Sequence, residues 1–124
     1  TARSTTIDAG TLELSGTNTI SGGITVDGTL ILGSNGAAGG ASGQITTTGS
    51  VISYADGVIS ATPITIASDT TQLEVATGDA AEQSGVIDED VANRPLEKIG
   101  AGELTLSATN SYTGDTTDSA GTLL

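Results

Sequence analysis

Cysteine, histidine, phenylalanine, tryptophan and methionine are all absent from this chain of 124 residues. Without histidine or cysteine, the chain cannot form the triads that activate a serine or cysteine nucleophile. The lack of cysteine suits a protein that crosses a membrane unfolded, because no stray disulfide can lock it in a wrong shape, although many short domains also lack cysteine. Tyr54 and Tyr112 are the only aromatic residues, so any core must consist of aliphatic side chains.

Basic residues are also scarce, with three Lys and Arg against fifteen Asp and Glu and a net charge of −12. Such a surface repels nucleic acids and anionic lipids, so nucleic-acid binding is excluded. No apolar run is long enough to span a membrane as a helix, and we expect no direct membrane insertion by this segment. Lys98, the only lysine, follows Glu97, and we expect it to be ion-paired or solvated rather than catalytic.

The chain is rich in Thr and Gly, with Val, Ile, Leu and Ala in short alternating runs. Val, Ile and Thr favour strands and Gly favours tight corners, whereas no segment has the 3.6-residue period of a helix. Gly33 to Gly43 is predicted to be a loop, and Asp79 to Pro95 an irregular stretch with one short strand inside it. Strands are predicted at 11–14, 24–26, 29–32, 44–47, 51–54, 64–67, 72–76, 86–88, 96–99, 103–106, 115–118 and 121–124.

A repeated phrase organises the chain: Ala9 to Gly22 returns as Ala101 to Gly114, with an offset of 92 residues throughout. Each copy reads as a Leu-x-Leu strand, a polar corner with an asparagine, and a closing glycine. We expect the leucines to face inward and the asparagines to occupy equivalent corners, where each amide bonds the neighbouring coil. Tyr112 is expected to cover a corner of its own coil. The shared positions are Leu12, Leu14, Asn18 and Gly22 in the first copy and Leu104, Leu106, Asn110 and Gly114 in the second.

Repetition of a strand-and-corner unit is typical of solenoids, in which each coil buries its apolar face against the next. A β-sandwich is the alternative, but the repeated corner and the lack of aromatic core residues favour an all-β, right-handed parallel β-helix of about six coils. We predict a single β-helical segment over residues 1–124, cut from a larger protein, because 4–12 and 115–123 resemble each other. Unpaired strands at both ends would favour end-to-end association.

Residues 96–124 resemble the passenger-associated repeat of Gram-negative autotransporters, the type V secreted proteins, almost throughout. The string Thr-Asn-Ser-Tyr-Thr-Gly-Asp-Thr-Thr at 109–117 carries most of the resemblance. Residues 4–32 resemble the repeat more loosely, and 82–87 resemble the coil that often precedes it. The chain departs from the family pattern at three places: Ile20 replaces a tyrosine, Asp118 replaces an apolar residue, and Asp88–Asp90 replaces a glycine-rich turn.

The resemblance implies a passenger that is exported through its own C-terminal β-barrel translocator and displayed on the cell surface, attached through the outer membrane. It also implies that this segment assists secretion and folding, as the stalk of an adhesin-like virulence protein. The alternative is a binding module whose flank or 33–43 loop contacts a host glycan, a matrix protein or another copy of the chain, in adhesion, autoaggregation or biofilm formation. The scarcity of aromatic residues and Arg, the usual hot-spot types, favours the structural role.

Enzymatic chemistry finds little support in these residues. Paired carboxylates, as in β-helical glycosidases, would lack aromatic platforms for a sugar, so we expect no enzyme and no cofactor. Asp88, Glu89 and Asp90 are weak candidates for a Ca²⁺ site, because carboxylate oxygens suit this cation. Neither an EF-hand loop nor a Gly-Gly-x-Gly-x-Asp repeat accompanies them, so a solvated acidic loop is the favoured interpretation.

Overall fold

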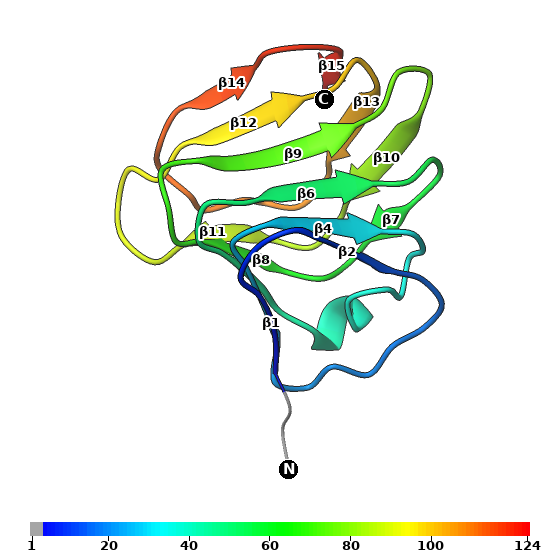
Figure 1. The fold of residues 1–124 in the computed structure, drawn as a ribbon. Coiled ribbons are helices and arrows are strands. Elements are labelled where there is room, and N and C mark those ends of the chain that lie inside the picture. Colours follow the sequence, from blue (N-terminus) through cyan, green and yellow to red (C-terminus); the bar gives the residue numbers. More distant parts are fainter. Residues whose placement is uncertain (1–3) are drawn as a thin grey trace.

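Fifteen β-strands and one short 3-10 turn make up the computed structural model, which describes residues 4–124 (Figure 1). The strands form three sheets, here called A, B and C. In spatial order, sheet A contains β1 (Thr5–Ile7), β3 (Ile24–Val26), β5 (Ile45–Thr47), β8 (Ile64–Ile66) and β11 (Ile87–Glu89). Sheet B contains β2 (Thr11–Leu14), β4 (Thr29–Leu32), β6 (Val51–Tyr54), β9 (Thr71–Val75), β12 (Leu96–Ile99) and β14 (Thr116–Asp118). Sheet C contains β7 (Ile59–Ser60), β10 (Ala80–Gln83), β13 (Glu103–Leu106) and β15 (Thr122–Leu123).

Each strand pairs in parallel with its counterpart one coil away, so the chain winds as a β-solenoid of about six coils. Coil length varies, from 18 residues between the paired Thr11 and Thr29 to 25 residues between Thr71 and Leu96. Sheet B runs through the whole stack, from β2 to β14 (Figure 1). Residues 4–124 contain no α-helix. The predicted all-β class and parallel β-helix are confirmed.

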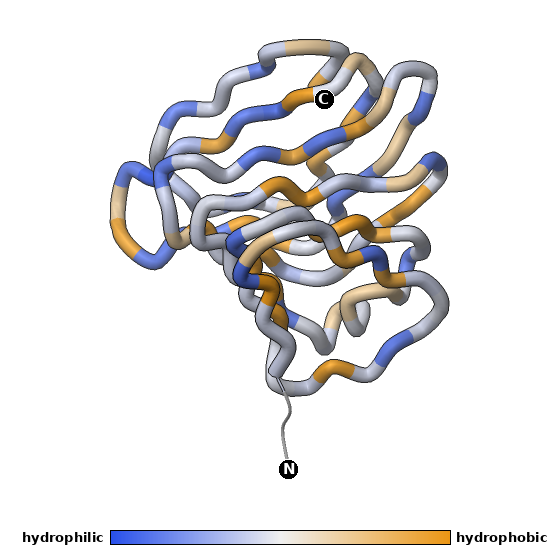
Figure 2. The backbone as a smooth tube through the Cα atoms, in the orientation of Figure 1, coloured by the Kyte–Doolittle hydropathy of each residue, from blue (hydrophilic) through white to orange (hydrophobic). Residues whose placement is uncertain are grey.

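The core consists of aliphatic side chains stacked in rows along the solenoid axis. In sheet A, pairing brings Ile24, Ile45, Ile64 and Ile87 into one row, and all four are at most 1% exposed. Alternation places the residue between two inward side chains on the outside, so hydrophobic and hydrophilic segments alternate along the strands (Figure 2). Full burial of one such side chain is worth about 1.5–3 kcal/mol, so the rows supply the main driving force for stacking.

A buried polar network interrupts these rows at Tyr54. Its hydroxyl donates to Gln83 Oε1 at 2.9 Å, and Gln83 Nε2 donates to the carbonyl oxygens of Thr62 at 2.7 Å and Gly85 at 3.1 Å. Burial raises the pKa of Tyr54, which keeps the phenol protonated as a donor. Because Tyr54 is only 2% exposed, it cannot serve as a sugar-binding platform.

Three strands lie outside the predicted set: β1, β7 and β10. The strand β10 falls inside the stretch from Asp79 to Pro95 that we expected to be irregular. Its inward residues are Ala81 and Gln83. From the sequence alone a glutamine is expected at an exposed position, so the alternation of this strand was not recognised. The predicted loop at 33–43 contains no strand and holds the 3-10 turn η1 (Gly40–Ser42).

Candidate functional site

The corner of the second repeated phrase, residues 107–115 and here called the repeat corner, closes over the end of sheet A. Sheet A stops at β11, and no strand of residues 4–124 pairs with the far edge of β11. Instead, the backbone N–H of Ile87 donates to Asn110 Oδ1 at 2.8 Å, and the N–H of Ser111 donates to the Ile87 carbonyl oxygen at 3.0 Å. The repeat corner thus satisfies two backbone groups that would otherwise need a further strand.

Thr113 and Gly114 extend this contact to the 90–95 loop. Thr113 Oγ1 donates to Glu89 Oε1 at 2.6 Å and accepts the backbone N–H of Asn93 at 3.0 Å. Asn93 has a left-handed backbone with φ of 71°, which asparagine tolerates better than most residues. A side chain on Gly114 would place its Cβ 2.2 Å from the carbonyl oxygen of Arg94, so only glycine allows the two segments to approach this closely.

Tyr112 lies beside these groups in the repeat corner. Its ring is half-buried against the hydrophobic core, and its hydroxyl lies 2.6 Å from Thr116 Oγ1. The side chain therefore packs within its own coil and leaves only part of the ring to solvent.

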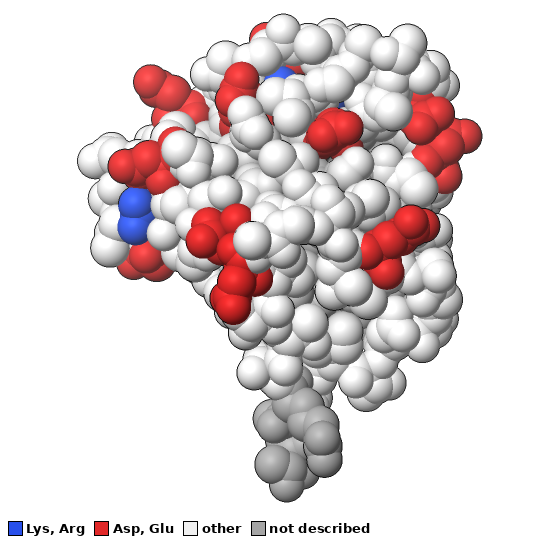
Figure 3. All heavy atoms as spheres, in the orientation of Figure 1, with Lys and Arg blue, Asp and Glu red and all other residues white. Residues whose placement is uncertain are grey.

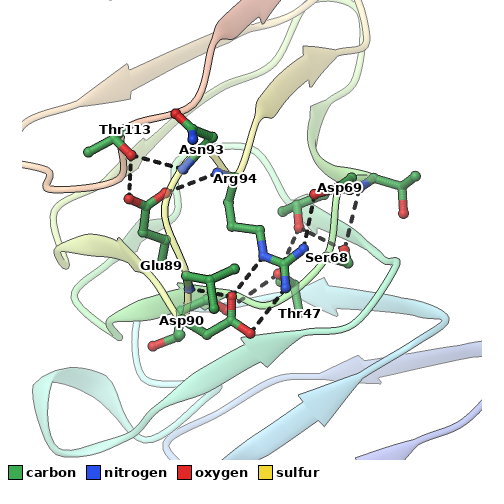
Figure 4. Close-up of polar contacts among 12 residues, drawn as sticks. Thr47, Ser68, Asp69, Glu89, Asp90, Asn93, Arg94 and Thr113 are labelled. Atoms are coloured by element: carbon green, nitrogen blue, oxygen red, sulfur yellow. Dashed lines mark hydrogen bonds and ion pairs between the residues drawn. The ribbon is translucent and has the colours of Figure 1, made fainter.

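Arg94 joins the acidic loop to the coil before it (Figure 4). Its Nε and Nη2 donate to the two carboxylate oxygens of Asp90 at 2.7 and 3.2 Å, and its Nη1 donates to Asp69 Oδ1 at 2.9 Å. The backbone N–H of Arg94 donates to Glu89 Oε2 at 3.0 Å. Arg94 thus bonds Asp69, and Glu89 bonds Thr113, so three successive coils are linked at one corner. The bond from Arg94 lowers the pKa of Asp90, and the bond from Thr113 lowers that of Glu89.

These contacts bear on the acidic run considered for calcium. Asp88 is exposed, while the carboxylates of Glu89 and Asp90 bind Thr113 and Arg94. Within residues 4–124, no group of three or more acidic, histidine or cysteine side chains is arranged to hold a metal ion. The run acts as a set of hydrogen-bond acceptors for the loop and for the repeat corner.

Lys98 is buried, so the expectation of a solvated or ion-paired side chain is wrong. Its pairing with Leu73 places it in an inner row of sheet B, and it is 1% exposed. Its Nζ donates to four backbone carbonyl oxygens: Ile99 at 3.0 Å, Gly100 at 2.7 Å, Gly102 at 3.1 Å and Ala120 at 3.0 Å. The last of these belongs to the following coil, whose Gly121 packs so closely that an added Cβ would lie 2.2 Å from the Gly102 oxygen. The ammonium therefore ties two stacked corners together.

Hydroxyl groups of the second repeated phrase, and of the residue that follows β14, make a recurring contact with carboxylates one coil earlier. The three pairs are Ser107 with Glu82 at 2.5 Å, Thr113 with Glu89 at 2.6 Å and Ser119 with Glu97 at 2.5 Å. Glu97 also accepts from Gln72 Nε2 at 2.8 Å, and these two bonds lower its pKa. A carboxylate accepts a stronger hydrogen bond than a neutral oxygen does, so the contacts favour attachment of the last coil.

In the first repeated phrase, Leu12 and Leu14 are half-buried and pack against the core, and Gly22 lies exposed in a turn. Asn18 Nδ2 donates to the carbonyl oxygens of Ser15 at 3.1 Å and Ala37 at 2.9 Å, so its amide bonds the following coil. Asn110 instead accepts from the preceding coil.

The two asparagines do not occupy equivalent corners, which corrects the expectation. The Leu-x-Leu strand β2 lies in sheet B, whereas its copy β13, with Leu104 fully buried and Leu106 half-buried, lies in sheet C. The four coils from Thr5 to Ile87 contain 82 residues (87 − 5). The two phrases are 92 residues apart, which is longer than these four coils. The second phrase therefore lies on the next face of the solenoid.

Two stretches of the chain, residues 5–28 and 96–124, match the family model of the passenger-associated-transport-repeat. The chain thus resembles this repeat in two places. The repeat is typical of autotransporter passenger domains, and the predicted resemblance is confirmed. No curated protein and no solved structure matches the chain. The first match covers β1, β2 and β3, and the second covers Lys98, the repeat corner, β14 and β15.

Two surface hollows lie near the second transport repeat. The hollow over sheet B is lined by Asp69 and Glu97, whose carboxylates already bind Arg94, Gln72 and Ser119. The hollow over sheet C is lined by Glu82 and Glu103, and Glu82 already accepts from Ser107. No helix within residues 4–124 has the length and apolarity needed to cross a membrane. What the transport repeat arranges here is a set of contacts between coils.

The stability contributed by the hydrogen bonds to these carboxylates should depend on pH. The pKa values of Glu89 and Glu97 are lowered below the ordinary 4.5, so the stability they contribute is present above that value and is lost as the pH falls through the lowered pKa. We expect the urea midpoint to fall between about pH 5 and pH 3, and the Glu89→Gln, Glu97→Gln double variant to show a flatter profile. Glu74→Gln is the control, because the Glu74 carboxylate makes no hydrogen bond to another side chain among residues 4–124. A double variant whose profile runs parallel to that of the wild type would contradict the assignment.

Replacing Lys98 by an apolar residue should lower the free energy of unfolding, although Lys98 lies in an otherwise aliphatic row. Lys98→Met leaves the buried carbonyl oxygen of Gly102 and three partly buried ones without this donor, and we expect the free energy of unfolding to fall by about 2–4 kcal/mol. Leu73→Met introduces the same side chain one coil earlier in the same row and should cost less than about 1.5 kcal/mol. Urea denaturation followed by circular dichroism gives both values. Equal stability of the two variants would mean that the ammonium is only tolerated in the core.

Proposed function

We propose that this chain is a structural stalk segment of an autotransporter passenger, whose second transport repeat assists secretion by docking each newly formed coil on the coil before it. The observation that supports the proposal best is the binding of the repeat corner to β11 through Asn110 and Thr113. These contacts join side chains of the repeat to the backbone N–H of Ile87 and to the carboxylate of Glu89 in the preceding coil. They can therefore form as soon as one coil has folded.

The geometry supports a folding mechanism that proceeds coil by coil. A β-strand at the end of a sheet needs partners for its backbone groups, and the repeat corner supplies them for Ile87 without a further strand. Lys98 then fixes the next pair of corners through the carbonyl oxygen of Ala120. Folding that proceeds coil by coil outside the cell would draw the rest of the passenger outward and prevent its return.

The wider setting is inferred from the repeat family. A passenger of this kind is carried by its own C-terminal β-barrel translocator and stands on the surface of a Gram-negative cell, attached through the outer membrane. The adhesin-like and virulence functions would then belong to the whole protein. Within this segment Tyr54 is buried and Tyr112 is half-buried, so the aromatic platform that often binds a glycan is lacking here. A rigid spacer between the membrane and a binding region is the role that this composition suits.

The test uses the parent protein in cells and scores surface exposure and cell attachment separately. Asn110→Ala combined with Thr113→Val removes the docking groups, and we expect several-fold lower surface exposure at equal synthesis. Thr109→Val is the matched control, because Thr109 lies in the same corner, is exposed and makes no side-chain hydrogen bond among residues 4–124. Normal exposure with lost attachment would favour the alternative, in which the corner is a binding surface for a host molecule. Normal exposure with normal attachment would refute the docking role.

A further inference from the structure

The 33–43 loop meets sheet C through the side chain of Asn35. Within residues 4–124, sheet C begins at β7, and the two coils before it have loops on this face. The backbone N–H of Ile59, the first residue of β7, donates to Asn35 Oδ1 at 2.8 Å. One coil later, the N–H of Ala80 at the start of β10 donates to Asp56 Oδ1 at 3.0 Å. In this sheet an amide oxygen and a carboxylate oxygen thus have the same role, which is to accept the first N–H of a strand.

The contact with Ile59 also makes the Asn35 side chain more reactive. An asparagine can lose its side-chain nitrogen when the backbone nitrogen of the next residue attacks the side-chain carbon Cγ and closes a five-membered imide ring. Negative charge develops on Oδ1 during this attack, and an N–H that already points at the developing oxyanion stabilises it. The N–H of Ile59 holds that position in the folded chain.

Gly36 supplies a backbone nitrogen that is free to attack. Its N–H makes no hydrogen bond among residues 4–124, and no side chain of its own shields it. The turn around it is closed by a bond from the N–H of Ala37 to the Ser34 carbonyl oxygen at 3.3 Å, which is longer than usual, so the local backbone rotates at low cost. Asn35 and Gly36 both line a hollow of about 420 Å³ that is open to solvent, so water reaches the pair.

The other three asparagines, Asn18, Asn93 and Asn110, lack this combination. The backbone N–H that follows Asn93 donates to Glu89 Oε2, and the one that follows Asn110 donates to the Ile87 carbonyl oxygen, so neither nitrogen is free. Asn18 is followed by a β-branched threonine, whose side chain shields the nitrogen. Its own Nδ2, the group that would leave, is held by two carbonyl oxygens.

We propose that Asn35 is a site of spontaneous covalent modification, at which water converts its side-chain amide to a carboxylate through a cyclic imide with Gly36. The Gly36 nitrogen gives its proton to solvent and bonds to Cγ, the bond from Cγ to Nδ2 breaks, and Nδ2 leaves as ammonia. Water then adds to one of the two imide carbonyl carbons and reopens the ring. Opening at Cγ gives aspartate, and opening at the main-chain carbon gives isoaspartate. One water is consumed and one ammonia is released, with no oxidation or reduction.

The two products differ in their effect on sheet C. Aspartate keeps the contact with Ile59, as the carboxylate of Asp56 does for the next strand. Isoaspartate adds a carbon to the main chain and moves the oxygen away, so it releases the start of β7. Either product adds a negative charge to a surface on which Asp and Glu side chains are already scattered (Figure 3). Asp56 lines the same hollow, so the two carboxylates repel each other and salt weakens this repulsion.

Peptide mapping by mass spectrometry tests the site, on the purified 124-residue chain incubated in mildly alkaline buffer. We expect Asn35 to be modified at least tenfold faster than any other asparagine, and Gly36→Ala to slow its modification at least fivefold. The added Cβ would lie 3.2 Å from the side chain of Thr17, which can rotate away, so the variant should fold. Ser42→Ala is the control, because Ser42 is exposed in the same loop and should leave the rate unchanged. Equal rates at the four asparagines, or an equal effect of the two variants, would overturn the proposal.

Unfolding the chain in guanidinium tests whether the fold sets this selectivity. Unfolding frees the nitrogen that follows Asn110 and removes the N–H of Ile59 from Asn35, so modification should accelerate more at Asn110 than at Asn35. An equal or larger acceleration at Asn35 would show that the fold does not favour this site.

Hydrogen exchange at the amide of Ile59 tests the outcome for sheet C. We expect Asn35→Asp, which reproduces the aspartate product, to keep the protection of this amide, and Asn35→Ala to lower it at least tenfold. The amide of Glu82, which donates to the Val58 carbonyl oxygen, is the internal reference and should stay protected in both variants. Loss of protection in Asn35→Asp equal to that in Asn35→Ala would contradict the claim that the product keeps the strand contact.

Discussion

The in-register parallel pairing of each strand with its counterpart one coil away is the constraint on which the rest of this structure depends. Pairing fixes which side chains share a row, and the aliphatic rows of sheets A and B follow from it. It also sets how closely successive corners approach, which is why Gly114 and Gly121 leave no space for a side chain. The same constraint creates a difficulty at every end of a sheet, where backbone groups have no strand to pair with.

The second transport repeat resolves that difficulty with side chains. Asn110 and Thr113 bind the edge of β11 and its loop, and Lys98 collects carbonyl oxygens from two stacked corners. Carboxylates on the surface accept hydrogen bonds from hydroxyl groups of the following coil. Without these bonds they would only add negative charge to the surface. Polar contacts thus take over where the aliphatic rows end, and this change lies within the stretch that matches the repeat family.

Much of the fold was accessible from the sequence because strand periodicity and glycine corners are local signals. The alternation around Leu30 and Ile52 predicted inward rows, and the lack of a helical period predicted the absence of helices. The face of the solenoid on which each repeat lies could not be predicted from the sequence. Coil lengths between 18 and 25 residues accumulate, so the copies fall on different sheets. Lys98 and Gln83 were missed for a related reason: a polar residue is read as exposed unless the groups that satisfy it are known, and these come from distant corners.

Hydrogen exchange at a single backbone amide tests the central claim most directly. In residues 4–124 the N–H of Ile87 has Asn110 Oδ1 as its acceptor, while the N–H of Ile64, one coil earlier in the same row, donates to the backbone of Val86. The account predicts that both amides are protected in the wild type and that Asn110→Ala removes protection from Ile87 while leaving Ile64 unchanged. Protection of Ile87 that survives the substitution would contradict the claim that the repeat corner holds the end of the sheet.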